Sequence, residues 1–125
     1  MKKYILISTV ILFSLLILTS AFAQSNKVCV YEFYGQGCPH CGKVENFLNT
    51  IEKAYPNVEI HRFEIYNNRE NLILLQDYFD AYNVPDSHRG VPVVFISDKY
   101  LAGEIPIINN LESLINYLGL PSAQL

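Results

Sequence analysis

The sequence is poor in several residue types, and each shortage excludes a class of protein. Its 125 residues include only six Gly and six Pro, too few for a collagen-like or low-complexity chain. Three cysteines are too few for a small domain held together by disulfides. Nine basic residues against twelve acidic ones form no cluster of the kind that a nucleic-acid or anionic-lipid surface needs. We therefore expect one globular domain without a nucleic-acid partner.

The N-terminal segment has the pattern of an export signal. Lys2 and Lys3 precede an uncharged, mostly apolar stretch over residues 4–23, which ends in Ala21-Phe22-Ala23. A basic start, an apolar middle and a small-residue exit predict a signal peptide over residues 1–23, cleaved after its last alanine. An uncleaved N-terminal membrane anchor is the alternative, because an apolar stretch of about 20 residues can span a bilayer.

The remaining domain, residues 24–125, is then extracytoplasmic, either periplasmic or secreted, in a compartment where disulfides form. Its apolar periodicity predicts an α/β fold with the element order β-α-β-α-β-β-α, in which helices flank a mixed four-stranded sheet. Asn109 with Glu112 resembles a capping box that opens the last helix. The expected strands are residues 28–34, 58–65, 91–96 and 100–105, and the other two helices begin at Cys38 and after Asn68.

The sequence Cys38-Pro39-His40-Cys41 follows the first expected strand and opens the first helix. Free backbone N–H groups and the helix dipole favour the thiolate of Cys38 there, and Pro39 fits the first turn, where no N–H is needed. A protonated His40 adds positive charge beside the sulfur, although a merely solvated histidine is the alternative. Cys41 can form a disulfide with Cys38, so the motif predicts a two-sulfur redox relay that needs no other cofactor.

Other uses of a Cys-x-x-Cys motif fit this sequence less well. A zinc knuckle needs four ligands, and the remaining candidates, Cys29, His61 and His88, have unsuitable spacings, so we expect no metal site. Covalent haem requires a histidine directly after the second cysteine, where this chain has Gly42. A purely structural disulfide would close too short a loop to stabilise the fold much.

The motif and three later segments resemble a known family. Glu32-Phe33-Tyr34, the Cys-Pro-His-Cys motif, Arg89-Gly90-Val91-Pro92, and Phe95 with Lys99-Tyr100 are similar to the DsbA family of thiol:disulfide oxidoreductases, within the thioredoxin-like superfamily. The resemblance implies a thioredoxin-like fold, with Cys38 as the exposed nucleophile, Cys41 as the buried resolving cysteine and Pro92 as a cis-proline beside them.

Two departures from that family concern substrates and partners rather than sulfur chemistry. The interval between Cys41 and Val91 is too short for the helical insertion that DsbA proteins carry, which indicates a minimal thioredoxin-like domain. Residues 85–88 also interrupt an otherwise thioredoxin-like stretch.

Glu32, Arg89 and Val91 complete the set of candidate site residues. A carboxylate on a central strand costs free energy to bury without a use or a partner. The resemblance implies that Glu32 exchanges a proton with the second cysteine; an edge-facing Glu32, or one paired with Lys43 or Lys53, is the alternative. Beside the cis-proline, Val91 and Arg89 are expected to flank a groove in which an extended substrate binds by strand addition.

These residues predict an extracytoplasmic, monomeric thiol:disulfide oxidoreductase. A stabilised Cys38 thiolate makes the disulfide a stronger oxidant, which favours a dithiol oxidase that introduces disulfides into exported cysteine-containing proteins through a mixed disulfide at Cys38. A reductase or isomerase, and a non-catalytic or metal-handling binding module, are the alternatives. The resemblance also implies a membrane redox partner that re-oxidises or re-reduces the pair.

Overall fold

The structure is a computed structural model, and it describes residues 27–119 together with Met1 and Lys3. The predicted signal peptide or anchor therefore lies outside the described residues, apart from those two positions. Within the described part of the chain, no helix has the length and apolar character needed to cross a membrane.

A four-stranded mixed sheet forms the centre of the described domain, with the strand order β2-β1-β3-β4. Its central strand β1 pairs in parallel with β2 and antiparallel with β3, while β3 and β4 form an antiparallel hairpin. The two inner strands are covered on both faces, which explains their nearly continuous apolar sequences. The bounds are β1 (Val28–Tyr34), β2 (Val58–Glu64), β3 (Val93–Ile96) and β4 (Lys99–Ala102).

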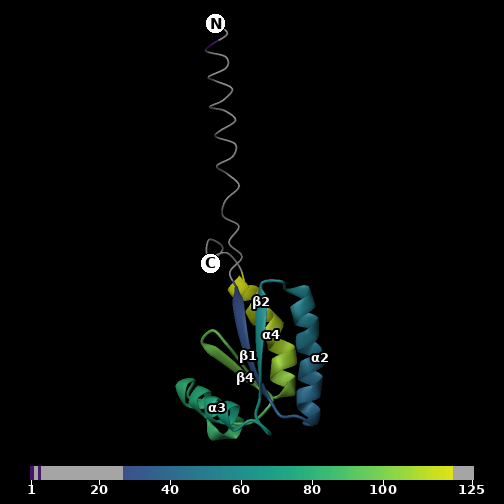
Figure 1. Ribbon diagram of the computed structural model, residues 1–125, viewed down its shortest axis with the longest axis vertical. Coiled ribbons are helices and arrows are strands. Elements are labelled where there is room, and N and C mark those ends of the chain that lie inside the picture. Colours follow the sequence, from purple (N-terminus) through teal and green to yellow (C-terminus); the bar gives the residue numbers. More distant parts are fainter. Residues whose placement is uncertain (2, 4–26, 120–125) are drawn as a thin grey trace.

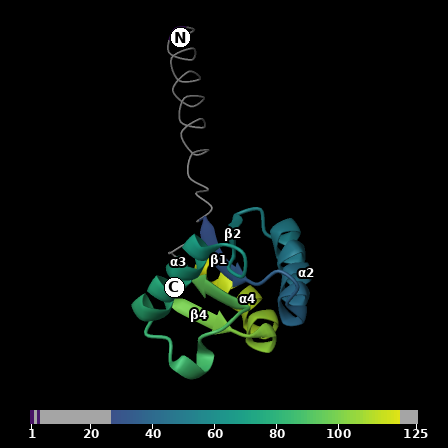
Figure 2. The same ribbon diagram turned by 60° about the horizontal axis from the view of Figure 1, so that its bottom comes forward.

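Three helices cover the sheet, two on one face and one on the other (Figures 1 and 2). Helices α2 (Pro39–Ala54) and α4 (Glu104–Gly119) lie side by side, and α3 (Arg69–Ala81) lies on the opposite face. A short 3₁₀ turn, Asp86–His88, stands between α3 and β3. The α/β fold class and the order β-α-β-α-β-β-α expected from the sequence are therefore confirmed.

Each face of the sheet has its own apolar core, because alternate residues of a strand point to opposite faces. Val30 of β1 faces α2 and α4, where it packs with Val44, Leu48, Val94, Ile96, Ile107, Leu111 and Ile115. The face toward α3 is aromatic and centres on Phe95. The Phe95 ring lies 4.9 Å from the ring of Tyr78 and 4.7 Å from that of Tyr82, between ring centroids.

The last helix begins earlier than the sequence predicts. Asn109 and Glu112 lie inside α4 rather than at its start, so the expected capping box is wrong. Gly103, with φ at 92°, ends β4, and Pro106 fits the first helical turn because no backbone N–H is needed there. Beginning at Glu104 also brings the fully buried Ile107 onto the apolar face of the helix.

We expect Phe95→Ala to lower the free energy of unfolding by about 3–5 kcal/mol, because removing a buried ring leaves a cavity. Phe95 has no exposed surface and contacts rings from β1, α3 and β4. Urea denaturation measures the loss. The matched control is Ile73→Ala in α3, where the side chain is 52% exposed and the expected loss is below about 1 kcal/mol. Equal losses in both variants would contradict an aromatic core on this face.

Candidate active site

The Cys-Pro-His-Cys motif lies where β1 ends and α2 begins. Gly37 has φ at 82°, a conformation that favours glycine, and it turns the chain from strand to helix. Cys38 caps α2, and its sulfur accepts a hydrogen bond from the backbone N–H of Cys41 at 3.3 Å. Pro39 stands in the first turn, as expected. Cys38 is half-buried, whereas Cys41 is only 3% exposed. Cys38 is therefore the more accessible cysteine of the pair.

Three segments that are distant in the sequence meet at this end of the sheet. The motif lies beside the Val91–Pro92 segment and the first turn of α4, at the bottom of Figure 1. The Val91–Pro92 peptide bond is cis, as the resemblance implied. The carbonyl of Pro92 accepts the N–H of Gly103 at 2.8 Å, which fastens this segment to the start of α4.

Two grooves border the Val91–Pro92 segment. One has a volume of about 330 Å³ and lies between His40, this segment and the first turn of α4. The other has a volume of about 220 Å³ and lies between the same segment and the residues from Ser87 to Gly90. Ile105, an apolar side chain that is 69% exposed, lines the first groove. The Val91–Pro92 segment therefore lies between two grooves, one of which is also lined by His40 of the motif.

Glu104, at the start of α4, is a site residue that the sequence does not reveal. Its Oε2 lies 2.6 Å from Nδ1 of His40, and its Oε1 accepts a hydrogen bond from Nζ of Lys43 at 3.0 Å. The hydrogen bonds from His40 and Lys43 lower the pKa of the Glu104 carboxyl. The negative charge of Glu104 therefore lies beside the Cys-Pro-His-Cys motif and opposes the positive potential at the start of α2.

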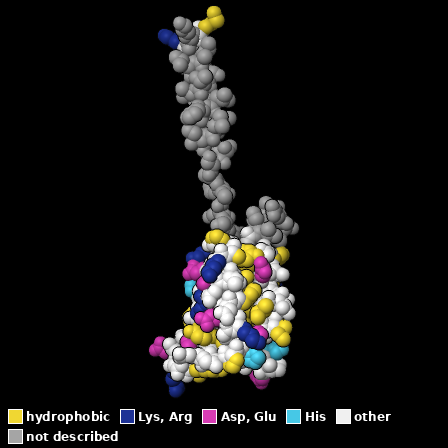
Figure 3. Space-filling view, turned by 90° about the vertical axis from the view of Figure 1, so that its right-hand side faces the viewer, with side chains coloured by type: hydrophobic (Ala, Val, Ile, Leu, Met, Phe, Trp, Pro, Cys, Tyr) yellow, Lys and Arg dark blue, Asp and Glu magenta, His cyan; other side chains and the backbone are white. Residues whose placement is uncertain are grey.

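The side of the molecule formed by α2 carries both signs of charge (Figure 3). Lys and Arg side chains are interspersed there with Asp and Glu, and histidines gather near the lower end, beside basic and acidic groups. At the motif, the acidic Glu104 contacts both His40 and the basic Lys43. On this face, basic charge does not gather into a continuous patch.

Glu32 is the one charged side chain that is fully buried in the described chain, with 1% exposure. Its Oε2 lies 3.4 Å from Nε of Arg62, and neither of its oxygens has a hydrogen-bond partner among the described residues. Burial raises the pKa of Glu32 to about 7, although the charge of Arg62 opposes this rise. The alternative that Glu32 pairs with Lys43 or Lys53 is wrong, because the register of β1 on β2 places Arg62 directly opposite Glu32.

The two cysteines of the motif stand in different surroundings. Burial raises the pKa of Cys41 to about 12, and a hydrogen bond between its side chain and that of Cys38, together with the negative charge of Glu32, acts in the same direction. The Cys41 thiolate is therefore a strong base that needs a proton whenever it is released. Glu32 acts electrostatically on that sulfur and is a group that can hold a proton near neutral pH.

Arg89 lines the smaller groove, but its guanidinium is already bound within the protein. Its Nε donates to the carbonyl of Val84 at 2.9 Å, and its Nη2 lies 2.8 Å from Oδ1 of Asp80. The guanidinium also lies over the ring of Phe79, 5.6 Å from the centroid. These contacts hold the segment over residues 85–88, which the sequence identifies as an interruption, against the end of α3.

Glu64 fastens the loop before the motif to the neighbouring loop. Its carboxylate accepts the backbone N–H groups of Gln36 at 3.1 Å, Tyr66 at 2.8 Å and Asn67 at 2.9 Å. Desolvation raises the pKa of Glu64, but these three hydrogen bonds outweigh it and lower the pKa overall. The short β1–α2 loop is thus anchored to the end of β2.

Similar folds occur among solved thioredoxins and glutaredoxins. Thioredoxin f2 from Chlamydomonas reinhardtii superposes with a TM-score of 0.54 at 16% identity, over 80% of this chain and 86% of that one. Glutaredoxin 1 from Francisella tularensis gives 0.52 at 18%, over 71% and 98%. Oxidized glutaredoxin 2 from C. reinhardtii gives 0.50 at 29%, over 76% and 84%. No protein-family model and no curated protein sequence matches the chain.

The chain therefore has the thioredoxin-like fold, with a Cys-x-x-Cys pair, Cys38 and Cys41, at the start of α2. These structural neighbours are thioredoxins and glutaredoxins, so the likeness to DsbA rests on the residues of the motif and of the Val91–Pro92 segment alone.

We expect Glu32→Gln to remove a pH dependence of stability. The folded protein keeps a proton on Glu32 up to about pH 7, whereas an exposed glutamate releases it near 4.5. Relative to the variant, the wild-type protein should therefore lose up to about 3 kcal/mol of unfolding free energy as the pH rises through this interval. Urea denaturation at several pH values measures the difference. Glu70→Gln, at an exposed position of α3, should follow the wild-type curve, and a parallel curve for Glu32→Gln would contradict a raised pKa.

Proposed function

We propose that this protein is a thiol:disulfide oxidoreductase that acts on cysteine-containing proteins. The arrangement of the two sulfurs carries the proposal: Cys38 is accessible and accepts a backbone N–H at the start of α2, and Cys41 is buried behind it. A hydrogen bond donated to a sulfur favours its anionic form, which is the reactive one. Thioredoxins and glutaredoxins of the same fold support the assignment.

In the oxidising direction, the Cys38–Cys41 disulfide accepts two electrons. A client thiolate attacks the Cys38 sulfur, so the bond to Cys41 breaks and a mixed disulfide forms between Cys38 and the client. A second client thiolate then attacks the client sulfur of that mixed disulfide and displaces the Cys38 thiolate. The client leaves with a disulfide, and the protein leaves with two reduced cysteines.

Glu32 supplies the proton that this exchange requires. Released Cys41 is strongly basic because burial raises its pKa to about 12, whereas Glu32, with a pKa raised to about 7, is partly protonated at neutral pH. Proton transfer from Glu32 to the Cys41 sulfur makes the release favourable. In the reverse direction Glu32 takes the proton back and activates Cys41.

Client segments bind beside Val91 and Pro92. Val91 precedes the paired part of β3, so an extended segment can align with it by strand addition. Ile105 offers an exposed apolar contact in the groove next to His40. Because Arg89 is held by Asp80 and Val84, it acts by supporting the 85–88 segment rather than by direct charge pairing with a client.

The preferred biological role is that of an exported dithiol oxidase that works as a monomer. The signal-like segment over residues 1–23 and the DsbA-like motif support this role. Exported cysteine-containing proteins would be the clients, and a membrane redox partner would re-oxidise the Cys38–Cys41 pair. The segment would be removed after Ala23 or remain as an N-terminal anchor.

A reductase or isomerase is the second candidate, and Glu104 is the observation that favours it. Its carboxylate contacts His40 and Lys43, so it offsets positive charge beside the motif. A weaker positive potential at Cys38 stabilises the thiolate less and makes the disulfide a weaker oxidant.

We expect Cys41→Ser to trap mixed disulfides between Cys38 and its clients, because the resolving sulfur is absent. Extracts of exported proteins, resolved with and without reductant, would show the trapped species. The matched variant Cys38→Ser should trap none, since Cys41 is buried. Absence of trapped species in Cys41→Ser, together with tight metal binding by the wild-type cysteine pair, would contradict the catalytic assignment and favour a metal-handling module.

Equilibration with glutathione buffers decides the direction and tests Glu104. We expect Glu104→Gln to raise the reduction potential and shift the glutathione equilibrium roughly two- to fivefold toward the reduced protein, because a negative charge near Cys38 is lost. The matched variant Lys43→Gln should shift it in the opposite direction. A wild-type potential below that of the glutathione couple would assign the protein as a reductase, and equal effects of both variants would contradict the charge argument.

A further inference from the structure

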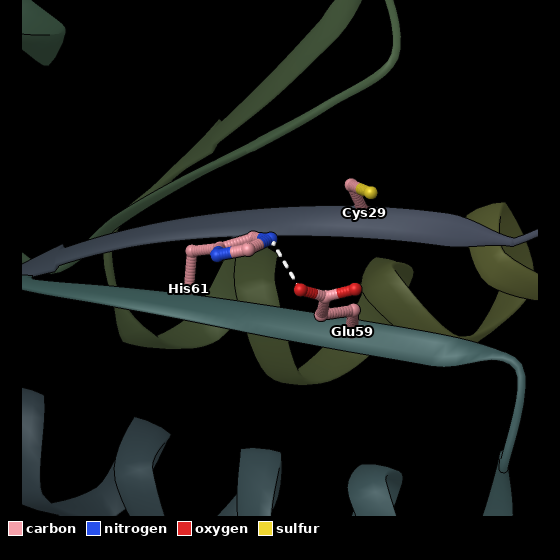
Figure 4. Close-up of side chains that lie close together, drawn as sticks. All are labelled: Cys29, Glu59 and His61. Carbon is pink, nitrogen blue, oxygen red and sulfur yellow. Dashed lines mark ion pairs between the residues drawn. The ribbon is translucent and has the colours of Figure 1, made fainter.

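Three potential metal ligands lie together at the end of the sheet farthest from the motif (Figure 4). In the β1–β2 register, Cys29 pairs with Glu59 and Tyr31 pairs with His61. Alternate residues share a face, so the side chains of Cys29, Glu59 and His61 emerge on the same side. Their Sγ, carboxylate oxygen and ring nitrogen all lie within 4.8 Å of one another.

This grouping cannot be read from the spacing of the residues along the chain. The sequence places Cys29 and His61 at intervals unsuitable for a zinc knuckle with the motif, and a lone cysteine in an apolar strand is ordinarily packed in the core. Cys29 is instead half-buried and belongs to neither apolar core. The parallel register, rather than the sequence interval, brings the three ligands together.

We propose that Cys29, Glu59 and His61 form a Zn²⁺ site that is separate from the redox pair. A thiolate, an imidazole and a carboxylate are the three kinds of side-chain ligand that Zn²⁺ takes in proteins. Three protein ligands leave the fourth position of a tetrahedral ion open to water or to an external ligand. The proposal does not depend on the activity of the Cys38–Cys41 pair.

The distances already approach those of a tetrahedral site. Two nitrogen or oxygen ligands, each about 2.0–2.1 Å from a tetrahedral Zn²⁺, stand about 3.3 Å apart, and Nε2 of His61 lies 3.2 Å from Oε1 of Glu59. A thiolate at about 2.3 Å from the ion would stand about 3.6 Å from these atoms. The Cys29 sulfur, within 4.8 Å of them, therefore needs to move by only about 1 Å, which a small side-chain rotation provides.

Neighbouring groups hold two of the ligands in place. The ammonium of Lys27 pairs with Oε2 of Glu59, which leaves Oε1 toward His61. The His61 ring stacks on Tyr31, with ring centroids 5.0 Å apart and planes at 14°. Such outer contacts orient ligands before the ion binds. The side chains of His61 and Glu59 are 36% and 40% exposed, so an ion can reach them from solvent.

Metal titration of the purified protein tests the site. Because the thiols of Cys38 and Cys41 could compete for the added metal, the titration uses Cys38→Ser/Cys41→Ser, in which Cys29 is the remaining thiol. Co²⁺, a spectroscopic substitute for Zn²⁺, should give thiolate-to-metal charge-transfer absorption with one ion per chain, and added Zn²⁺ should displace it. In that background, Cys29→Ser should abolish the absorption, while His61→Asn and Glu59→Gln should each weaken binding at least roughly tenfold.

His88→Asn is the matched control, because His88 is an exposed histidine outside the proposed site, with its Nδ1 3.0 Å from the hydroxyl oxygen of Tyr100. The metal-binding curve of this variant should equal that of the parent. Circular dichroism verifies that each variant is folded, and Cys29→Ala replaces Cys29→Ser if the latter is not. Absence of saturable binding in the parent, or binding that persists without Cys29 or without His61, would overturn the proposal.

Discussion

The hydrogen bond from the backbone N–H of Cys41 to the Cys38 sulfur is the interaction on which the candidate active site depends. It exists because α2 begins at the carboxyl end of a central strand, where helical N–H groups have no partner in the helix. The same geometry leaves Cys38 half-buried and buries Cys41. Because both residues are cysteines, any difference in their reactivity comes from this difference in surroundings.

Two carboxylates near the pair have different roles because their environments differ. Glu32 is buried, faces a single guanidinium at 3.4 Å, and keeps its proton up to about pH 7. Glu104 receives hydrogen bonds from His40 and Lys43, which keep it ionised. One is thus suited to moving a proton to and from the inner sulfur, and the other to setting the potential at the outer sulfur. In the proposed reaction, the balance between the charge of Glu104 and the helix start would set the reduction potential of the pair.

The strands and the helices could be predicted from the sequence to within a few residues, because apolar periodicity and turn residues are local signals. The cis-proline could be expected only from the resemblance of the motif and of residues 89–92 to a known family. The partners of Glu32 and His40 could not. Arg62 faces Glu32 through the register of two parallel strands, and Glu104 reaches His40 because α4 begins before the apparent capping box. Charged partners across a sheet or between helix ends depend on alignment in three dimensions, which residue spacing along the chain does not encode.

Cys29 lies near the start of β1, and the Cys-Pro-His-Cys motif follows its end. The proposed metal site and the cysteine pair are therefore separated by the length of one strand. Cys29 and Tyr34 are five residue steps apart on β1, a span of about 17 Å, roughly twice the distance over which physiological salt screens a charge. A divalent ion at the distant end would thus leave the potential at the reactive sulfur almost unchanged. In the proposed arrangement, the same short domain would carry an ion and exchange electrons independently, with β1 as the spacer between the two sites.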